Sequence, residues 1–159
     1  MRVKYRECVS VEHVRLAVEA LAPKTVILDV EPMVAYWNTD VVVLNAGVQH
    51  AITLLSTVPS VQAIAFATNS YRRPSVKIIT PPDIRISYEA TAMKPFNVRP
   101  YRDLPLPGVV IGDQVATDGL LAYRLQFSFI RYRVAMSMRP RLMNSLGQPL
   151  KPLLFQRII

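Results

Sequence analysis

Acidic, hydroxyl and amine side chains follow several apolar runs of this sequence. The candidates for chemistry are Asp29, Glu31, Thr68, Asn69, Lys94, Asp113 and Asp118. Carboxylate oxygens are the ligands that Mg²⁺ prefers in proteins. Hydroxyl, amide and ammonium groups donate hydrogen bonds to phosphoryl oxygens. If the fold brings these side chains together, the mixture suits a magnesium ion and a phosphate.

The runs that precede these residues are typical of strands buried on both faces of a parallel sheet. Residues 25–30 (TVILDV) and 61–67 (VQAIAFA) are largely apolar, and residues 109–111 (VVI) end at Gly112-Asp113. In an open parallel sheet, ligands bind at the carboxyl ends of the strands. We therefore expect the candidate side chains to converge at one edge of the sheet.

Helices are expected between these strands. Ser10 can cap a helix over residues 11–21, and Asp40 can cap one over residues 40–57, because apolar residues recur there every three or four positions. Further expected elements are strands at 76–80, 84–88 and 127–132, a short helix within 96–104 and a helix at 116–125. This alternation predicts an α/β domain with a mostly parallel sheet.

The ends of the chain lack such periodicity. Residues 1–10 read as an N-terminal arm, and residues 138–159 are interrupted by three prolines. The 159 residues allow one domain with a substantial core. We expect that domain to span residues 1–137, with a C-terminal tail at 138–159 that wraps the domain or contacts a partner.

The net charge of +8 is concentrated near the C-terminus. Residues 119–159 hold no acidic residue and seven basic ones, which are Arg124, Arg131, Arg133, Arg139, Arg141, Lys151 and Arg157. Such a segment can contact an anionic membrane surface, nucleic acid or the ribosome. The alternative is a solvated surface in an arginine-rich chain, since arginine outnumbers lysine 14 to 5.

Composition excludes several classes of protein. A single cysteine, Cys8, excludes a disulfide framework and a cysteine zinc cluster. No apolar run reaches the roughly 18 residues of a membrane span, and the first residues do not resemble a signal peptide. The expected location is the cytoplasm, with peripheral membrane contact through the tail as an option.

Four motifs in order resemble the haloacid dehalogenase (HAD) superfamily of phosphohydrolases. Residues 27–33 (ILDVEPM) stand where the family has a strand followed by D-x-D-x-T, and residues 66–70 (FATNS) stand where it has a strand ending in Ser or Thr. Residues 92–95 (AMKP) match the Lys-Pro element, and residues 112–118 (GDQVATD) match G-D-x-x-x-T-D. In particular, the chain resembles subfamily IIIA, which is typified by YqeG-like and phosphatidylglycerophosphate phosphatases.

This resemblance implies a three-layer Rossmann-like fold without a large cap domain, and a role for each motif residue. Asp29 would be the nucleophile that forms an aspartyl-phosphate, and Glu31 would be the general acid and base. Thr68 and Asn69 would bind phosphoryl oxygens, and Lys94 would steady Asp29 and the phosphate. The implied ligands of Mg²⁺ are Asp29, Asp113, Asp118 and the backbone carbonyl of Glu31.

The first motif departs from the family pattern at three positions. Glu31 stands where the family has Asp, Pro32 lacks the backbone N–H that would face phosphate, and Met33 replaces a Thr. Two functions follow as hypotheses. The first is a phosphohydrolase of a phosphomonoester, such as phosphatidylglycerophosphate or another bulky phosphate. The second is an inactive HAD-like module that binds nucleic acid, the ribosome or a protein through its basic C-terminal segment.

Two further groups of residues lie close to the motifs. Tyr36 and Trp37 follow the first motif and either line a substrate entrance or pack under a loop. Residues 71–73 (YRR) follow the second motif and either hold an anionic substrate or form a solvated basic loop.

Overall fold

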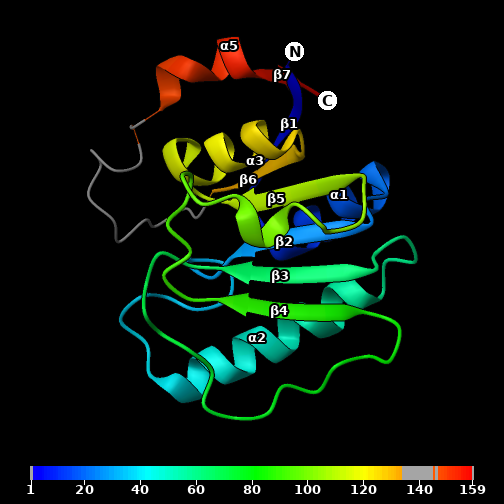
Figure 1. Cartoon of the computed structure of the whole chain (residues 1–159), viewed down its shortest axis with the longest axis vertical. Helices are drawn as coiled ribbons and strands as arrows, with labels where there is room; N and C mark the ends of the chain where they lie inside the picture. Colours follow the sequence, from blue (N-terminus) through cyan, green and yellow to red (C-terminus); the bar gives the residue numbers. More distant parts are fainter. Residues whose placement is uncertain (1, 134–144, 146, 159) are drawn as a thin grey trace.

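A seven-stranded, all-parallel sheet organises the chain in the computed structural model, which describes residues 2–133, 145 and 147–158 (Figure 1). The strand order is β4-β3-β2-β5-β6-β1-β7. The strands are β1 (Val3–Cys8), β2 (Thr25–Asp29), β3 (Ala63–Ala67), β4 (Arg85–Glu89), β5 (Gly108–Gly112), β6 (Ser128–Tyr132) and β7 (Phe155–Arg157). The predicted α/β class and the parallel sheet are therefore confirmed.

Helices cover both faces of this sheet. The helices are α1 (Val11–Leu21), α2 (Val41–Ser56), α3 (Leu120–Leu125) and α5 (Lys151–Leu154), with short turns η1 (Arg99–Tyr101), η2 (Val115–Gly119) and η3 (Gln148–Leu150). One core cluster joins α1 and α2 to one face, and a second joins η1 and α3 to the other. The three layers are consistent with a Rossmann-like fold.

Local sequence explains the elements that were predicted correctly. All residues of β2, β3 and β5 are buried, as the apolar runs predict for central parallel strands. The Ser10 hydroxyl accepts a hydrogen bond from the backbone N–H of His13 at 3.2 Å, and the Asp40 carboxylate accepts one from Val43 at 2.9 Å. Both predicted N-caps are therefore confirmed.

Two expectations about local structure were wrong. Residues 3–8 form β1 instead of an arm, because Val3, Tyr5 and Cys8 are buried on the sheet while charged residues separate them. Residues 76–80 form no strand. The main-chain N–H and C=O of Ile79 instead bond to the side-chain amide of Gln49 on α2, at 3.0 and 3.1 Å.

The predicted helices after β4 and β5 are shorter than expected. Within residues 96–104 only the turn η1 is helical, and Pro100 lies within it. Residues 116–125 contain the π-helical turn η2, followed by the six residues of α3. The π-helical turn arises because the N–H groups of Asp118 and Gly119 both donate to the Gln114 carbonyl, at 3.0 and 3.1 Å.

The C-terminal segment, expected to wrap the domain or contact a partner, adds a strand to the sheet. β7 pairs in parallel with β1, with Phe155 opposite Val3. Basic residues of this quarter also contact the domain. Lys151 and Arg133 donate to the Glu7 carboxylate at 2.6 and 3.2 Å, and Arg131 donates to the Asp113 carbonyl at 3.0 Å.

These contacts separate the basic residues into groups. Arg124 also bonds within the domain, to the carbonyls of Pro95 and Phe96, whereas Arg157 is exposed. Arg139 and Arg141 lie outside the described residues. In the part of the chain that the structure describes, no helix is both long enough and apolar enough to cross a membrane.

Candidate metal and phosphate site

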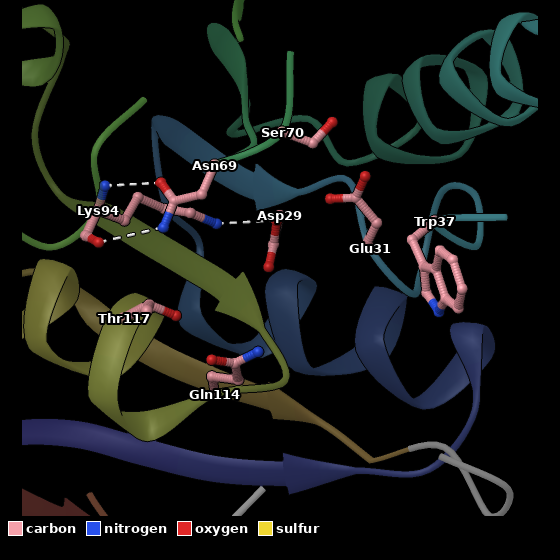
Figure 2. Close-up of a pocket in the computed structure, with 8 residues that line it drawn as sticks. All are labelled: Asp29, Glu31, Trp37, Asn69, Ser70, Lys94, Gln114 and Thr117. Carbon is pink, nitrogen blue, oxygen red and sulfur yellow. Dashed lines mark hydrogen bonds and ion pairs between the residues drawn. The ribbon is translucent and has the colours of Figure 1, made fainter. Parts of the chain in front are cut away.

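Four of the seven candidate residues, Asp29, Glu31, Asn69 and Lys94, line a cavity of about 260 Å³ at the carboxyl edge of the sheet (Figure 2). Asp29 is the last residue of β2, Thr68 follows β3, and Asp113 follows β5. Lys94 comes from the loop between β4 and β5. The residues that line the cavity are Asp29, Glu31, Trp37, Asn69, Ser70, Lys94, Gln114 and Thr117.

Lys94 links two acidic side chains inside the protein. Its Nζ lies 2.8 Å from Asp29 Oδ1 and 2.7 Å from Asp118 Oδ1, and all three side chains are at least nine-tenths buried. Asn69 holds the backbone of this lysine in place, because its side-chain amide accepts from Lys94 N at 2.8 Å and donates to Lys94 O at 3.2 Å. The ammonium group is therefore positioned by both its ion pairs and its own main chain.

Three carboxylates meet beside this lysine. Asp29, Asp113 and Asp118 each offer an oxygen, and these oxygens lie within 4.8 Å of one another. Asp118 Oδ2 also accepts the backbone N–H of Gln114 at 3.1 Å. A Cβ atom at Gly112 would lie 2.3 Å from the Asp118 carboxyl carbon, so this approach requires glycine.

Burial and mutual repulsion make it costly to ionise all of these carboxylates. Burial, followed by the charge of Asp118, raises the pKa of Asp29 well above its usual value although Lys94 opposes the shift. Burial lowers the pKa of Lys94, but Asp118 and Asp29 more than offset this and raise it above its usual value. When ionised, three carboxylates face one ammonium, which leaves two negative charges. A set of hard oxygen donors with this charge fits Mg²⁺.

Glu31 is held on the other side of Asp29. Its Oε2 accepts a hydrogen bond from Thr68 Oγ1 at 2.7 Å, and its Oε1 lies 3.7 Å from Arg72 Nη1. Glu31 Oε1 is buried and has no hydrogen-bond partner among the described residues. Arg72 also donates to the carbonyls of Tyr36 and Thr39, at 2.7 and 2.8 Å, so it attaches the loop after β2 to the loop after β3.

The structure thus brings together Asp29, Lys94, Asp113 and Asp118, whereas two expected phosphate ligands have other partners. Thr68 is fully buried and donates to Glu31, and the Asn69 amide is bonded to the Lys94 backbone. The sequence indicated that residues 71–73 either hold an anionic substrate or form a solvated basic loop, and it did not indicate that Arg72 bonds to the carbonyls of the loop after β2.

Gln114 and Thr117 were also missed as residues that line the cavity. Both lie inside the motif at residues 112–118, between Asp113 and Asp118. Comparison with known proteins adds no assignment, since no family model, no curated protein and no solved structure matches this chain.

Proposed function

We propose that the chain is a Mg²⁺-dependent phosphohydrolase that cleaves a phosphomonoester through an aspartyl-phosphate, as its resemblance to the HAD superfamily implies. The observation that carries the proposal is the buried bridge from Lys94 to Asp29 and Asp118, beside Asp113 and at the wall of an open cavity. A nucleophilic carboxylate, a fixed ammonium and further acids are the parts that phosphoryl transfer uses.

The first step transfers the phosphoryl group to the protein. A carboxylate oxygen of Asp29 forms a bond to phosphorus while the bond from phosphorus to the ester oxygen breaks. The leaving oxygen takes its electron pair with it and receives a proton from the carboxyl group of Glu31. Lys94 reduces the negative charge around Asp29 and so helps an anionic substrate to approach.

The second step releases phosphate. A water molecule gives a proton to the Glu31 carboxylate as its oxygen bonds to phosphorus, and the bond from phosphorus to Asp29 breaks. The Glu31 carboxyl is then ready for the next leaving group. The Glu31 carboxylate is directed by Thr68 and lies near Arg72, which together limit how far it can swing.

Mg²⁺ would be held by oxygens of Asp29, Asp113 and Asp118, and it would neutralise charge on the phosphoryl oxygens when bound. The protein's own contribution is to keep these acids close in a buried position. Gly112 allows the close approach of Asp118, and the Gln114 N–H fixes the orientation of that carboxylate.

The substrate class we propose is a phosphomonoester with an accessible, bulky remainder. Between Asp29 and Lys94 the described elements are α2, β3 and β4, which belong to the sheet and its layers. A phosphate on a lipid, such as phosphatidylglycerophosphate, is one such substrate. Contact with an anionic membrane through the exposed basic residues near the C-terminus would support it.

Phosphate release in MgCl₂ tests the proposal, with a panel of sugar, polyol, nucleotide and lipid monophosphates. We expect turnover with wild type, and a loss of at least about 10³-fold in Asp29→Asn, because the substitution removes the nucleophile. Asp83→Asn is the matched control, since Asp83 is exposed and remote from the cavity residues in sequence and fold. Equal, negligible release from wild type and Asp29→Asn on every substrate would refute the enzymatic function.

A second candidate is a non-catalytic binding module, and the bond between Glu31 and Thr68 favours it. The hydroxyl expected to bind phosphate already donates to a carboxylate, at 2.7 Å. The variant Glu31→Asp with Met33→Thr separates the two candidates. A phosphatase adapted to Glu31 should lose activity, by roughly 10²–10⁴-fold if acid-base help is lost, whereas an inactive module should gain turnover or stay inactive.

A further inference from the structure

One wall of the cavity carries polar groups that the proposed chemistry does not use. Gln114 is only 6% exposed, yet its side-chain amide makes no hydrogen bond to any of the residues that the structure describes. Only its backbone is engaged, the N–H by the Asp118 carboxylate and the carbonyl by the N–H groups of Asp118 and Gly119. The amide atoms are accessible from the cavity, where they can bond to a group that enters it. Since Gln114 lines the cavity, a group in the cavity is the natural partner (Figure 2).

Thr117 adds a second such group from the same segment. It lies in the π-helical turn η2, lines the cavity, and its hydroxyl makes no hydrogen bond within the described ranges. π-Helical turns occur frequently at functional sites. An amide and a hydroxyl together offer both donors and acceptors, which matches the hydroxyl groups of a ligand because each of these also donates and accepts.

Trp37 supplies an apolar surface to the same cavity. Its side chain is drawn beside Glu31 in Figure 2, and the residue is 58% exposed although it lines the cavity. The face of an indole ring carries partial negative charge and attracts the polarised C–H groups of a polyol or sugar. An alkyl leaving group would contact the indole as well, but it would offer no hydrogen bond to Gln114 and Thr117 in place of water.

We propose that Gln114, Thr117 and Trp37 form a subsite next to Asp29 that binds the hydroxyl-bearing part of a polyol or sugar monophosphate. The inference rests on the proposed function, because Asp29 would act on the phosphate of the same ligand. This chemistry has two sources, a free polyol phosphate and the headgroup of a phospholipid, and the experiment below has an arm for each.

The sole tryptophan of the chain makes binding directly measurable. The Asp29→Asn substitution prevents turnover. The fluorescence emission of Trp37 in this variant is followed in MgCl₂ during titration with glycerol 3-phosphate or propyl phosphate. Both ligands carry the same phosphate on three carbons, but propyl phosphate has no hydroxyl groups. We expect a Kd at least about 10-fold lower for glycerol 3-phosphate, since each hydrogen bond to a neutral group is worth roughly 3–10-fold.

The double substitution Gln114→Leu with Thr117→Val in the same background removes both hydrogen-bonding side chains and should bring the two Kd values within about 2-fold of each other. Gln62→Leu is the matched control and should preserve the difference, because Gln62 is exposed near the opposite end of β3. Equal Kd values before the substitutions, discrimination that survives the double substitution, or no change of Trp37 emission with either ligand would each overturn the subsite.

Phosphate release by the wild-type chain separates this inference from the proposed function. Equal release from glycerol 3-phosphate and propyl phosphate would uphold the phosphatase and overturn the subsite. No release, together with discrimination in the binding assay, would uphold the subsite and overturn the phosphatase. Vesicles that contain phosphatidylglycerophosphate form the second arm, and tighter binding to them than to free glycerol 3-phosphate would identify the lipid headgroup as the source.

Discussion

Replacement of Lys94 by methionine tests the electrostatic reasoning most directly. Methionine keeps the length and most of the apolar stem of lysine but removes the ammonium that lies 2.8 Å from Asp29 and 2.7 Å from Asp118. The side chains of Lys94, Asp29 and Asp118 are 2%, 7% and 0% exposed, so water cannot solvate the two carboxylates once the ammonium is gone. The variant therefore leaves two buried carboxylates facing each other.

Breaking a buried ion pair in this way costs about 3–5 kcal/mol of the free energy of unfolding. For a chain of this length, 1 kcal/mol corresponds to about 2–4 °C in Tm. Without added metal at pH 7, Lys94→Met should therefore lower Tm by roughly 6–20 °C relative to wild type. Lys77→Met is the matched control, because Lys77 is exposed, and it should change Tm by less than about 2 °C.

The pH dependence has a definite sign. The pKa of Asp29 is raised by burial and by Asp118, and it should rise further when Lys94 is absent. Protonation of Asp29 removes the repulsion, so the folded state is favoured below this raised pKa and loses stability as pH rises through it. The difference between Lys94→Met and wild type should then shrink towards acid pH. A loss of Tm no larger than that of Lys77→Met, or one independent of pH, would refute the reasoning.

Three further outcomes are expected. Gly112→Ala should lower the free energy of unfolding by more than about 2 kcal/mol and weaken Mg²⁺ binding, because its Cβ would displace the Asp118 carboxylate. Calorimetry measures the Mg²⁺ affinity, and an unchanged affinity would contradict this. Asn69→Ala should lower the turnover rate more than it raises KM, since it frees the Lys94 backbone, and a change in KM alone would contradict it. Burial opposes the shift, but Lys151 and Tyr5 lower the pKa of Glu7 to about 2. Glu7→Gln should therefore lower the free energy of unfolding by about 1–2 kcal/mol at pH 7, after allowance for solvent screening. This loss, measured by urea unfolding, should disappear as pH falls from about 4.5 towards 2. A loss that stays constant over that pH range would exclude the ionic explanation.

The central part of the fold could be predicted because its signals are local. The apolar runs of β2, β3 and β5 and the capping side chains of Ser10 and Asp40 lie within a few residues of the structure they specify. The edge of the sheet was different. In β1 charged residues separate the buried ones, and in β7 only Phe155 is buried; the pairing of these strands joins residues more than 150 positions apart.

The candidate site divides in the same way. Sequence order alone indicates that Asp29, Thr68 and Asp113 follow strands, and parallel strands bring their carboxyl ends to one edge. It does not show that Thr68 bonds to Glu31 or that Asn69 bonds to the backbone of Lys94. Nor does it show that the Lys94 ammonium pairs with both Asp29 and Asp118. Those contacts depend on strand register and on the paths of separate loops.

By itself, then, the sequence determined the α/β class, the central strands, the two capped helices and the order in which acids, hydroxyls and a lysine reach the sheet edge. Only the tertiary structure decided which of these groups touch, how deeply they are buried, and that Gln114, Thr117 and Trp37 line the same cavity. The physical reason is range. Periodicity and capping act over one or two helical turns, whereas charge pairing and cavity shape arise from segments that approach only when the whole sheet has formed.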